Sequence, residues 1–403
     1  MSNPIFGLHE ENTLVQFHNV MEKADRGALM ADGHLGYIMP IGGVAAYESR
    51  VSPCGVGFDI GCGNMAVKTD WKNTDEYLTQ GDLGLLLNDI QKNISFGIGR
   101  KNKYKVDHVL FELPHWTAYD EPYRSELFKL AQEQLGTVGS GNHYVDIFED
   151  EDGYIWIGVH FGSRGLGHKT CTGFLNLAIN GKWDERAPEQ EVLLDISEDL
   201  GSRYMVAMNL AGEYAKAGRE WVVGEVVKML GAQVTDVVHN HHNFAWTEKH
   251  DGQYYIVVRK GATPAFPGQR GFVGGSMGDD AVIIEGVDSE RSKAALYSTV
   301  HGAGRVMGRR EAAGRKKWKR NKETGERELI IKSEGKITRD MMHEWLAQKG
   351  VLLRGGGTDE SPHVYRRLSE VLKQQGDTIK ILHTLTPLGV VMAGEHEFDP
   401  YKD

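Results

Sequence analysis

The stretch "MADGHLGYIMPIGGVAAYESRVSPCGVGFDIGCGNMAVKTD" (residues 30–70) alternates short apolar runs with glycine-rich turns. Apolar runs of this length between turn signals predict buried strands joined by tight loops. Farther along, "SRYMVAMNLAGEYAKAGREWVVGEVVKML" (202–230) spaces its apolar residues three to four positions apart and predicts the longest helix. Further helices are expected within 75–94, 122–135, 337–350 and 362–375. Further strands are expected within 139–150, 153–167, 253–262 and 280–286.

This mixture of elements predicts a mixed α/β (α+β) fold. The segments that carry candidate site residues run from 32 to 305, so a boundary between them would split the site, and we expect a single large domain over 1–403. Three parts of it are expected to differ from the rest: a peripheral, helical or irregular N-terminal segment (1–29), a basic and partly helical insertion (306–350) and a C-terminal tail (395–403).

The composition, with 40% hydrophobic and 25% charged residues, is ordinary for a soluble globular protein. Cys54, Cys62 and Cys171 make no disulfide framework, and the N-terminus lacks the charged and apolar regions of a signal peptide. No apolar run approaches the length that spans a bilayer. We therefore expect a cytoplasmic protein without a membrane partner.

The net charge of −10 argues against a surface that coats nucleic acid generally. One segment is nevertheless basic: "GRREAAGRKKWKRNK" (308–322) contains a single acidic residue, Glu311. Its basic residues are Arg309, Arg310, Arg315, Lys316, Lys317, Lys319, Arg320 and Lys322. Such a run is either a solvated helix or loop face or a local patch for a polyanion.

Glycine is in excess, with 50 residues that cluster beside His, Asp, Asn and Ser. Glycines in such places let the backbone approach a ligand closely, which indicates a site built from several loops; a loop-rich fold is the alternative. In "GFDIGCGN", Asp59 and Cys62 stand three apart across a glycine turn. A thiolate with a carboxylate suits Mn²⁺, Zn²⁺ or Fe²⁺ better than Mg²⁺, although a buried Cys beside a turn Asp is commoner.

Two later segments add imidazoles. "TVGSGNHYVDI" places Asn142 and His143 directly after Gly-Ser-Gly, and "IGVHFGSRGLGH" places His160 at the end of a strand. Ser163 and Arg164 follow in a Gly-Ser-Arg-Gly loop, which offers the donors of a phosphate site. Each histidine alone is more often structural, but repeated glycine-flanked segments with His, Cys or Asp favour a shared metal site.

"VTDVVHNHHNFAW" (234–246) gathers three histidines and two asparagines. If the stretch is a strand, His239 and His241 share one face while Asn240 and His242 share the other, so all three imidazoles cannot easily bind one ion. "GFVGGSMGDD" (271–280) resembles a backbone cradle for a base or phosphate, or is only a flexible turn.

"HGAGRVMGR" (301–309) sets His301 before Gly-Ala-Gly-Arg. A turn or capping histidine is the commoner case. A neutral imidazole with an arginine nearby is also a candidate nucleophile toward phosphorus.

Together, "MADGHLGYIMPIGGVAAY", "GVGFDIGCGN", "GSGNHYVDI", "VHFGSRGLG", "HHN", "GSMG" and "HGAGR" resemble, in order and spacing, the signatures of the RtcB family of RNA-splicing ligases. The resemblance runs from about residue 30 to the C-terminus and includes "TDESPHVYRRLSEVL" and "LTPLGVVMAG". It implies central β-sheets surrounded by helices, with a deep cleft that holds two Mn²⁺ ions. It also implies that a 2′,3′-cyclic phosphate or 3′-phosphate RNA end is joined to a 5′-hydroxyl end with GTP, through a covalent histidine–GMP intermediate, in tRNA splicing or RNA repair.

The resemblance also implies site residues. His301 is implied as the guanylylated catalytic residue, with Asp32 and Arg164 at the RNA. The implied metal ligands are Asp59, Cys62, His143, His160 and His242. The implied nucleotide contacts are Asn142, His143, Asp146, His242, Asn243, Gly274, Gly275, Ser276, Met277, Ala281, His301, Gly302, Ala303 and Gly304. His239 and His241 are expected to be supporting or structural.

The sequence departs from the family on the nucleotide side. Met392 and Ala393 stand where members typically have a closing Lys-Gly, and Lys402 lies in a tail beyond. Asp146, Gly274 and Ala281 replace the usual Glu, Pro and Ser. The loss of a buried hydrogen bond costs about 1–3 kcal/mol, so several such changes are enough to weaken or redirect GTP recognition.

Two alternatives to a ligase with the family's specificity therefore stay open. One is a diverged paralogue with altered nucleotide or RNA specificity, and the other is a non-ligating protein that binds RNA ends. The sequence leaves undecided the RNA substrate, any accessory activator protein, the metal in the cell, the oligomeric state and the role of 308–322.

Overall fold

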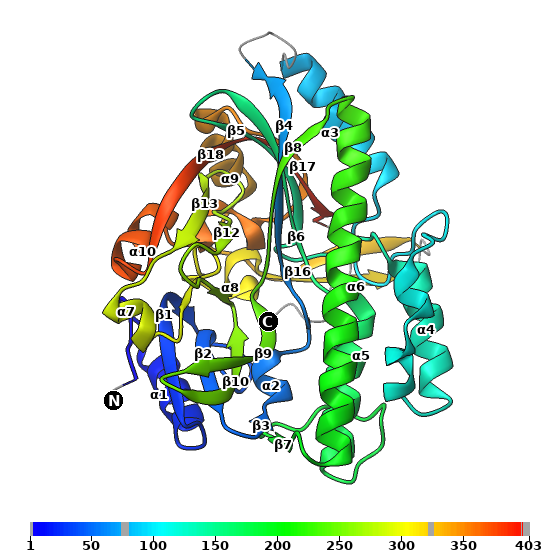
Figure 1. Cartoon of the computed structure of the whole chain (residues 1–403). Helices are drawn as coiled ribbons and strands as arrows, with labels where there is room; N and C mark the ends of the chain where they lie inside the picture. Colours follow the sequence, from blue (N-terminus) through cyan, green and yellow to red (C-terminus); the bar gives the residue numbers. More distant parts are fainter. Residues whose placement is uncertain (1–2, 74–79, 321–325, 396, 398–403) are drawn as a thin grey trace.

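The computed structural model describes residues 3–73, 80–320, 326–395 and 397 (Figure 1). Within them the α-helices are α1 Glu11–Met21, α2 Pro53–Val56, α3 Gln80–Asn93, α4 Tyr123–Gln134, α5 Arg164–Ala178, α6 Asp199–Leu230, α7 Glu290–Ala294, α8 Arg309–Ala313, α9 Arg339–Lys349 and α10 Leu368–Gln375. Short 3₁₀ helices are η2 Val109–Glu112, η3 Pro114–Ala118, η4 Thr358–Glu360 and η5 Pro362–Val364. The long helix α6 spans much of the molecule's length and packs against β4 and β6 of the large sheet and against α5 (Figure 1).

The larger sheet has the strand order β12-β13-β18-β5-β6-β4-β8, and β17 pairs with β18. Its strands are β4 Gly63–Lys72, β5 Tyr144–Asp150, β6 Tyr154–Phe161, β8 Val234–His241, β12 Arg270–Val273, β13 Ala281–Gly286, β17 Leu352–Gly356 and β18 Ile379–Gly394. Neighbours are antiparallel except β17 and β18. Because neighbours are antiparallel, the start of one strand meets the end of the next at the same edge of the sheet.

A second sheet has the order β1-β2-β10-β9, with β1 Arg26–His34, β2 Ile41–Tyr47, β9 Asn243–His250 and β10 Gln253–Lys260. Strand β2 is buried on both faces. Val44 and Ala46 join the apolar cluster that includes Val371 of α10, while Ala45 and Tyr47 join the cluster around α5 and α6. Burial on both faces explains why "GGVAAY" reads as a continuous small and apolar run. Short strands pair separately: β3 Arg50–Val51 with β7 Leu194–Asp195, β11 Ala262–Pro264 with β14 Ser298–Val300, and β15 Arg315–Arg320 with β16 Arg327–Ser333.

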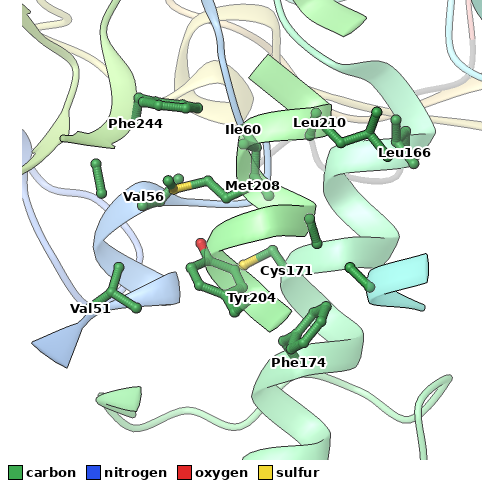
Figure 2. Packing of buried hydrophobic residues seen from close by; sticks show 14 of the residues in the cluster. Val51, Val56, Ile60, Leu166, Cys171, Phe174, Tyr204, Met208, Leu210 and Phe244 are labelled. Atoms are coloured by element: carbon green, nitrogen blue, oxygen red, sulfur yellow. The ribbon is translucent and has the colours of Figure 1, made fainter. Parts of the chain in front are cut away.

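The core between α2, α5 and α6 holds the loop that precedes β4. Ile60 lies fully buried beside Met208 and Leu210 of α6, and Leu166 of α5 packs nearby (Figure 2). A fully buried isoleucine is worth about 1.5–3 kcal/mol of apolar burial. The burial of Ile60 therefore anchors the loop that precedes β4 to α5 and α6.

The mixed α/β architecture expected from the sequence is confirmed. The helix predicted at 202–230 is α6, three residues longer at its start, and the stretch 30–70 forms strands and tight loops. Two details differ. Strand β1 begins at Arg26, inside the segment expected to be helical or irregular, because its residues pair with Ala46 and its neighbours. The basic run 308–322, expected as a helix or loop face, is in part the strand β15 of a two-stranded ribbon.

Lys322, Lys402 and most of the predicted tail 395–403 lie outside the described residues. In the part of the chain that is described, no helix has the length and apolar character needed to cross a membrane.

Candidate active site

One edge of the larger sheet collects the ligand-type residues. Cys62 directly precedes β4, His143 directly precedes β5, and His242 directly follows β8. His160, in β6, pairs with Asn64 of β4 on one side. Because these strands are antiparallel neighbours, residues spread over 180 positions of the chain meet at one edge.

These residues line a cavity of about 270 Å³ together with Asp59 and His301. Sγ of Cys62 lies 3.8 Å from Nε2 of His143 and 3.9 Å from Nε2 of His160. The ligand atoms of these three residues all lie within 4.8 Å of one another. Separations of this size fit a shared cation with bonds of about 2.0–2.3 Å to nitrogen and sulfur.

Hydrogen bonds behind the imidazoles fix which nitrogen faces the centre. Nδ1 of His160 lies 2.8 Å from Oδ1 of Asn64, and Nδ1 of His143 lies 2.9 Å from the carbonyl oxygen of Val138. Since both partners accept, each Nδ1 carries the proton and each Nε2 offers a lone pair. Nε2 of His143 nevertheless lies 3.1 Å from Oδ2 of Asp59. A lone pair and a carboxylate this close need a proton or a cation between them, so the donor set fits a metal ion.

Burial and neighbouring charges set the protonation of the candidate ligands. Burial acts to raise the pKa of Asp59, but a proton on Nε2 of His143 would hydrogen-bond to the carboxylate and add a positive charge, and together these effects lower that pKa to about 2. A cation in the place of that proton acts in the same direction. Burial, followed by the charge of Asp59, raises the pKa of the Cys62 thiol well above its usual value, so a thiolate here needs a cation beside it. Burial lowers the pKa values of His160 and His242 well below the usual range, so both imidazoles are neutral and able to bind metal.

A glycine makes the approach of the Asp59–Cys62 loop possible. Gly61 has φ +69°, and a Cβ there would lie 2.9 Å from Cα of Gly212 in α6. Both the backbone conformation and the close packing exclude other residues at low cost. The loop between the two candidate ligands therefore rests directly on α6.

His301 lies at the end of a row of imidazoles. Ring centroids are separated by 5.4 Å from His143 to His160, 5.2 Å from His160 to His242 and 4.9 Å from His242 to His301. His301 follows β14, and its side chain is 15% exposed in the cavity. The predicted nucleophile and the predicted metal ligands therefore share one cavity.

Asp32, on β1, lies beneath His301 and is fully buried. Its Oδ2 accepts hydrogen bonds from the backbone N–H groups of His301 at 2.9 Å and Gly302 at 3.2 Å. The same oxygen lies 2.6 Å from Nδ1 of His301, at ion-pair distance but not aligned for a hydrogen bond. The carboxylate thus contacts the imidazole from the buried side, and the RNA contact expected for Asp32 stays a prediction.

The remaining histidines of the 234–246 stretch lie where strand alternation predicts. His239 and His241 point to the face of α6, where both contact Arg219. Asn240 points to the other face and accepts a hydrogen bond from the backbone of Phe272. His242 is the turn between β8 and β9, so the chain passes from one sheet to the other at a candidate ligand.

Most residues predicted on the nucleotide side line the same cavity. They are Asn142, Asn243, Gly274, Gly275, Ser276, Met277, Gly302, Ala303 and Gly304. The side chain of Asn243 already accepts from the backbone N–H of Gly261 at 2.8 Å, which holds the wall in place. Two predicted residues, Asp146 and Ala281, are buried behind the lining.

Gly274, Asp146 and Met392 all lie close to Tyr144. A Cβ on Gly274 would lie 2.5 Å from the hydroxyl oxygen of Tyr144, so this tyrosine occupies the space that a larger residue at 274 needs. Asp146, two residues farther along β5, has Oδ1 buried without a partner among the described residues, and burial raises the pKa of its carboxyl well above the usual value. Met392 pairs with Tyr144 across β18 and β5 and also lines the cavity, while Ala393 is buried. This part of the wall therefore consists of Gly274, Tyr144 and Met392, and the Asp146 carboxyl is buried behind it.

Arg164 does not line the cavity. Its guanidinium donates to Oγ1 of Thr137 and the carbonyl of Gly97, both at 3.3 Å, and its backbone has φ +56°. The RNA contact expected for Arg164 stays a prediction.

Several residues of the cavity were not predicted from the sequence, among them His34, Tyr144, Glu360 and Tyr365. Arg305, the arginine noted beside His301 in the sequence, also lines the cavity. His34 lies in "GHLGY", where its glycine neighbours were the available signal. Arg305 binds Glu360 at 2.9 Å and Tyr365 at 2.8 Å, a contact between distant segments that no local pattern reveals.

Known proteins are similar in sequence to this chain over nearly its whole length. The family model described as tRNA-splicing ligase RtcB matches residues 14–393. The chain belongs to the RtcB family. The RNA-splicing ligase RtcB of Escherichia coli K12 is 30% identical over 388 residues, which cover 89% of this chain and 88% of that protein. The tRNA-splicing ligase RtcB of Methanococcus maripaludis is 29% identical over 442 residues, covering 90% and 87%. The RNA-splicing ligase RtcB homolog 1 of Entamoeba histolytica is 30% identical over 444 residues, covering 90% and 79%.

Proposed function

We propose that this protein is a metal- and GTP-dependent RNA ligase that joins a 2′,3′-cyclic phosphate or 3′-phosphate RNA end to a 5′-hydroxyl end. The observation that carries the proposal is the shared cavity: candidate ligands from four strand ends lie beside a histidine that a buried carboxylate supports. Membership in a family whose named members are RNA- or tRNA-splicing ligases supports the same reaction.

Asp59, Cys62, His143, His160 and His242 are the residues proposed to hold metal, and the thiolate with imidazoles favours Mn²⁺ over Mg²⁺. Bound cations supply Lewis-acid stabilisation of charge on phosphate oxygens. The protein's own contribution is the fixed tautomer of His143 and His160, which keeps both Nε2 atoms available without rearrangement.

His301 is proposed as the nucleophile toward the α-phosphorus of GTP. Its Nε2 lone pair forms the bond to phosphorus, the bond to the leaving pyrophosphate breaks, and the imidazole becomes cationic. Oδ2 of Asp32, 2.6 Å from Nδ1, stabilises that cation and holds the ring orientation. We therefore propose an orienting role for Asp32 in place of the RNA contact that the resemblance implies.

Nucleotide selection is where this protein is proposed to differ from its relatives. Asp146 is buried behind the lining and its raised pKa favours the uncharged carboxyl, while Met277 and Met392 add apolar surface. A diverged nucleotide preference is therefore the second candidate, and relaxed discrimination between guanosine and other bases is its signature. Arg164 is retained as the proposed RNA phosphate contact.

The direct test is a joining assay. A labelled RNA with a 2′,3′-cyclic phosphate end and a second RNA with a 5′-hydroxyl end are incubated with protein, Mn²⁺ and each of the four nucleoside triphosphates in turn. A joined product with GTP is expected, and a joined product with another triphosphate supports the diverged specificity. Tight binding of RNA ends with no product under any triphosphate would instead identify a non-ligating end-binding protein.

A further inference from the structure

Arg219 of α6 is a completely buried arginine. Nη1 donates to the carbonyl oxygen of Gly61 at 3.0 Å and also to that of Phe161. Nη2 lies 2.9 Å from Nε2 of His239 and 3.0 Å from Nδ1 of His241. Nδ1 of His241 also lies 2.9 Å from the carbonyl oxygen of Gly61. None of these close contacts of Arg219 is a carboxylate, and a buried cation without a carboxylate partner is costly.

The two carbonyls belong to segments that carry neighbouring candidate ligands. Gly61 directly precedes Cys62, and Phe161 directly follows His160. The last register pair of β4 and β6 is Gly63 with Phe161, so Arg219 continues the connection beyond the end of the ladder. One terminal nitrogen of the guanidinium binds both carbonyls, and the other terminal nitrogen faces the two imidazoles.

Helix α6 supplies a rigid base for this contact. Gly212, Ala215 and Arg219 are spaced three and four residues apart and share one helix face. A Cβ built on Gly61 would lie 2.9 Å from Cα of Gly212 and 3.2 Å from Cβ of Ala215. The same face therefore packs against the ligand loop and, one turn later, hydrogen-bonds to it.

The histidines hold the guanidinium in place. A guanidinium only donates, so Nε2 of His239 accepts with its lone pair and His239 is neutral. Burial, followed by the charge of Arg219, lowers the pKa of His239 in the same direction. The two histidines of the 234–246 stretch that do not enter the cavity thus have a defined role.

We propose that Arg219 is a positioning residue for the metal centre: with His239 and His241 it ties the Cys62 and His160 segments to α6 at ligand separation. The inference rests on the metal centre of the proposed function. A fixed positive charge near cations weakens their binding by itself. Its presence is explained by the geometry that it maintains and by the anionic ligands Asp59 and Cys62 close to it.

The test uses Co²⁺ alone as the probe, because a thiolate ligand gives a charge-transfer absorption that reports Cys62 directly. The dissociation constant and this absorption are measured for the full chain, for Arg219→Met and for Arg219→Lys. Removal of a residue that orients ligands typically weakens metal binding about 10–100-fold, and this is expected for Arg219→Met together with a weaker absorption. Arg219→Lys is expected between it and the unsubstituted chain, because one ammonium cannot replace the fork.

Arg259→Met is the matched control. Arg259 is also fully buried, but its partners are Glu248, Ser298 and Leu296, away from the candidate ligands. The Arg259→Met substitution is expected to lower the melting temperature and leave Co²⁺ binding unchanged. The double variant His239→Asn/His241→Asn, which keeps Arg219, is expected to weaken Co²⁺ binding in the same direction as Arg219→Met.

Unchanged or tighter Co²⁺ binding by Arg219→Met, with the full thiolate absorption, would overturn the inference. If Arg219→Met does not fold, the same result in Arg219→Lys and in the double histidine variant overturns it. If the unsubstituted chain shows no more thiolate absorption than Cys62→Ala does, the metal centre itself is contradicted. The two failures are therefore distinguishable.

Discussion

At the scale of single residues, Gly274 and Tyr144 in the cavity wall fit each other closely. Gly274 has no Cβ, and the Tyr144 hydroxyl occupies the place where that Cβ would lie. The hydroxyl itself is buried and has no hydrogen-bond partner in the described part of the chain. The pair therefore fills this part of the wall without a hydrogen bond to the Tyr144 hydroxyl.

Gly274→Ala is expected to destabilise the protein by about 1–3 kcal/mol, because a Cβ at 2.5 Å from the Tyr144 oxygen is a steric clash. Tyr144→Phe removes that oxygen, so the double variant is expected to recover most of the stability. Urea unfolding of the four members of this cycle measures the coupling. Additive effects of the two substitutions would show that the clash is relieved elsewhere.

Asp32→Asn is expected to lower the rate of nucleotide attachment about 10²–10⁴-fold, because the imidazolium formed at His301 loses its counter-charge and its orientation. The rate of protein labelling by GTP measures the effect. Asp150→Asn is the matched control, since Asp150 is also buried but pairs with Lys68 at the opposite end of β5. Equal labelling rates in Asp32→Asn and the unsubstituted chain would contradict the orienting role.

At the scale of elements, the site depends on how the ligand loop rests on α6. Three contacts position Asp59 and Cys62. Ile60 is buried in the core, Gly61 packs against Gly212, and Arg219 donates a hydrogen bond to the carbonyl oxygen of Gly61. The alternation of side chains along β8 places His239 and His241 against Arg219, while His242, which follows the strand, lines the cavity.

Gly61→Ala is expected to lower both stability and Co²⁺ affinity. A positive φ alone costs a non-glycine residue about 1–2 kcal/mol, and the contact with Gly212 adds to this. Gly252→Ala, in the turn between β9 and β10, has φ +87° with nothing within 4 Å of its Cβ, so it carries the backbone cost alone. Urea unfolding and Co²⁺ titration of both variants separate the two effects. Equal Co²⁺ affinity in both would show that the loop is placed by other contacts.

At the scale of the whole molecule, charge is uneven. The chain has a net charge of −10, while the ribbon β15–β16 begins at Arg315, ten positions after Arg305 of the cavity lining. A basic strand that follows a cavity-lining segment of an otherwise acidic protein would attract the RNA substrate of the proposed function. At the base of the ribbon, a Cβ on Gly314 would lie 2.6 Å from the backbone nitrogen of Gly335, so the two ends of the ribbon meet.

Deleting 315–334 and joining Gly314 to Gly335 is therefore expected to preserve the fold and the labelling of His301 by GTP. RNA binding is expected to weaken. The plot of log affinity against log salt is expected to become less steep, by about 0.7 for each phosphate of a single-stranded RNA that the ribbon had neutralised. Fluorescence anisotropy of labelled RNA at several salt concentrations measures both. An unchanged slope would identify the ribbon as a solvated face.

The sequence predicted the mixed α/β class, the long helix and the convergence of the ligand-type residues, because glycine-flanked motifs and strand alternation are local signals. It did not reveal Arg219 or the contact of Arg305 with Glu360, since both depend on segments that meet only in the folded chain. Nor did it place Asp32 beneath His301, because a buried carboxylate and an exposed one have the same sequence pattern. Side-chain partners across sheets were thus the part that required the structure.

Central to the proposed function is a covalent bond between His301 and a nucleotide, formed beside a metal centre. The most direct measurement incubates the protein with Mn²⁺ and GTP radiolabelled at the α-phosphate and then maps the label by mass spectrometry. We expect an acid-labile label on His301 that disappears in His301→Ala and is strongly reduced in Cys62→Ala. A label on another residue, or no label with any nucleoside triphosphate, would contradict this chemistry.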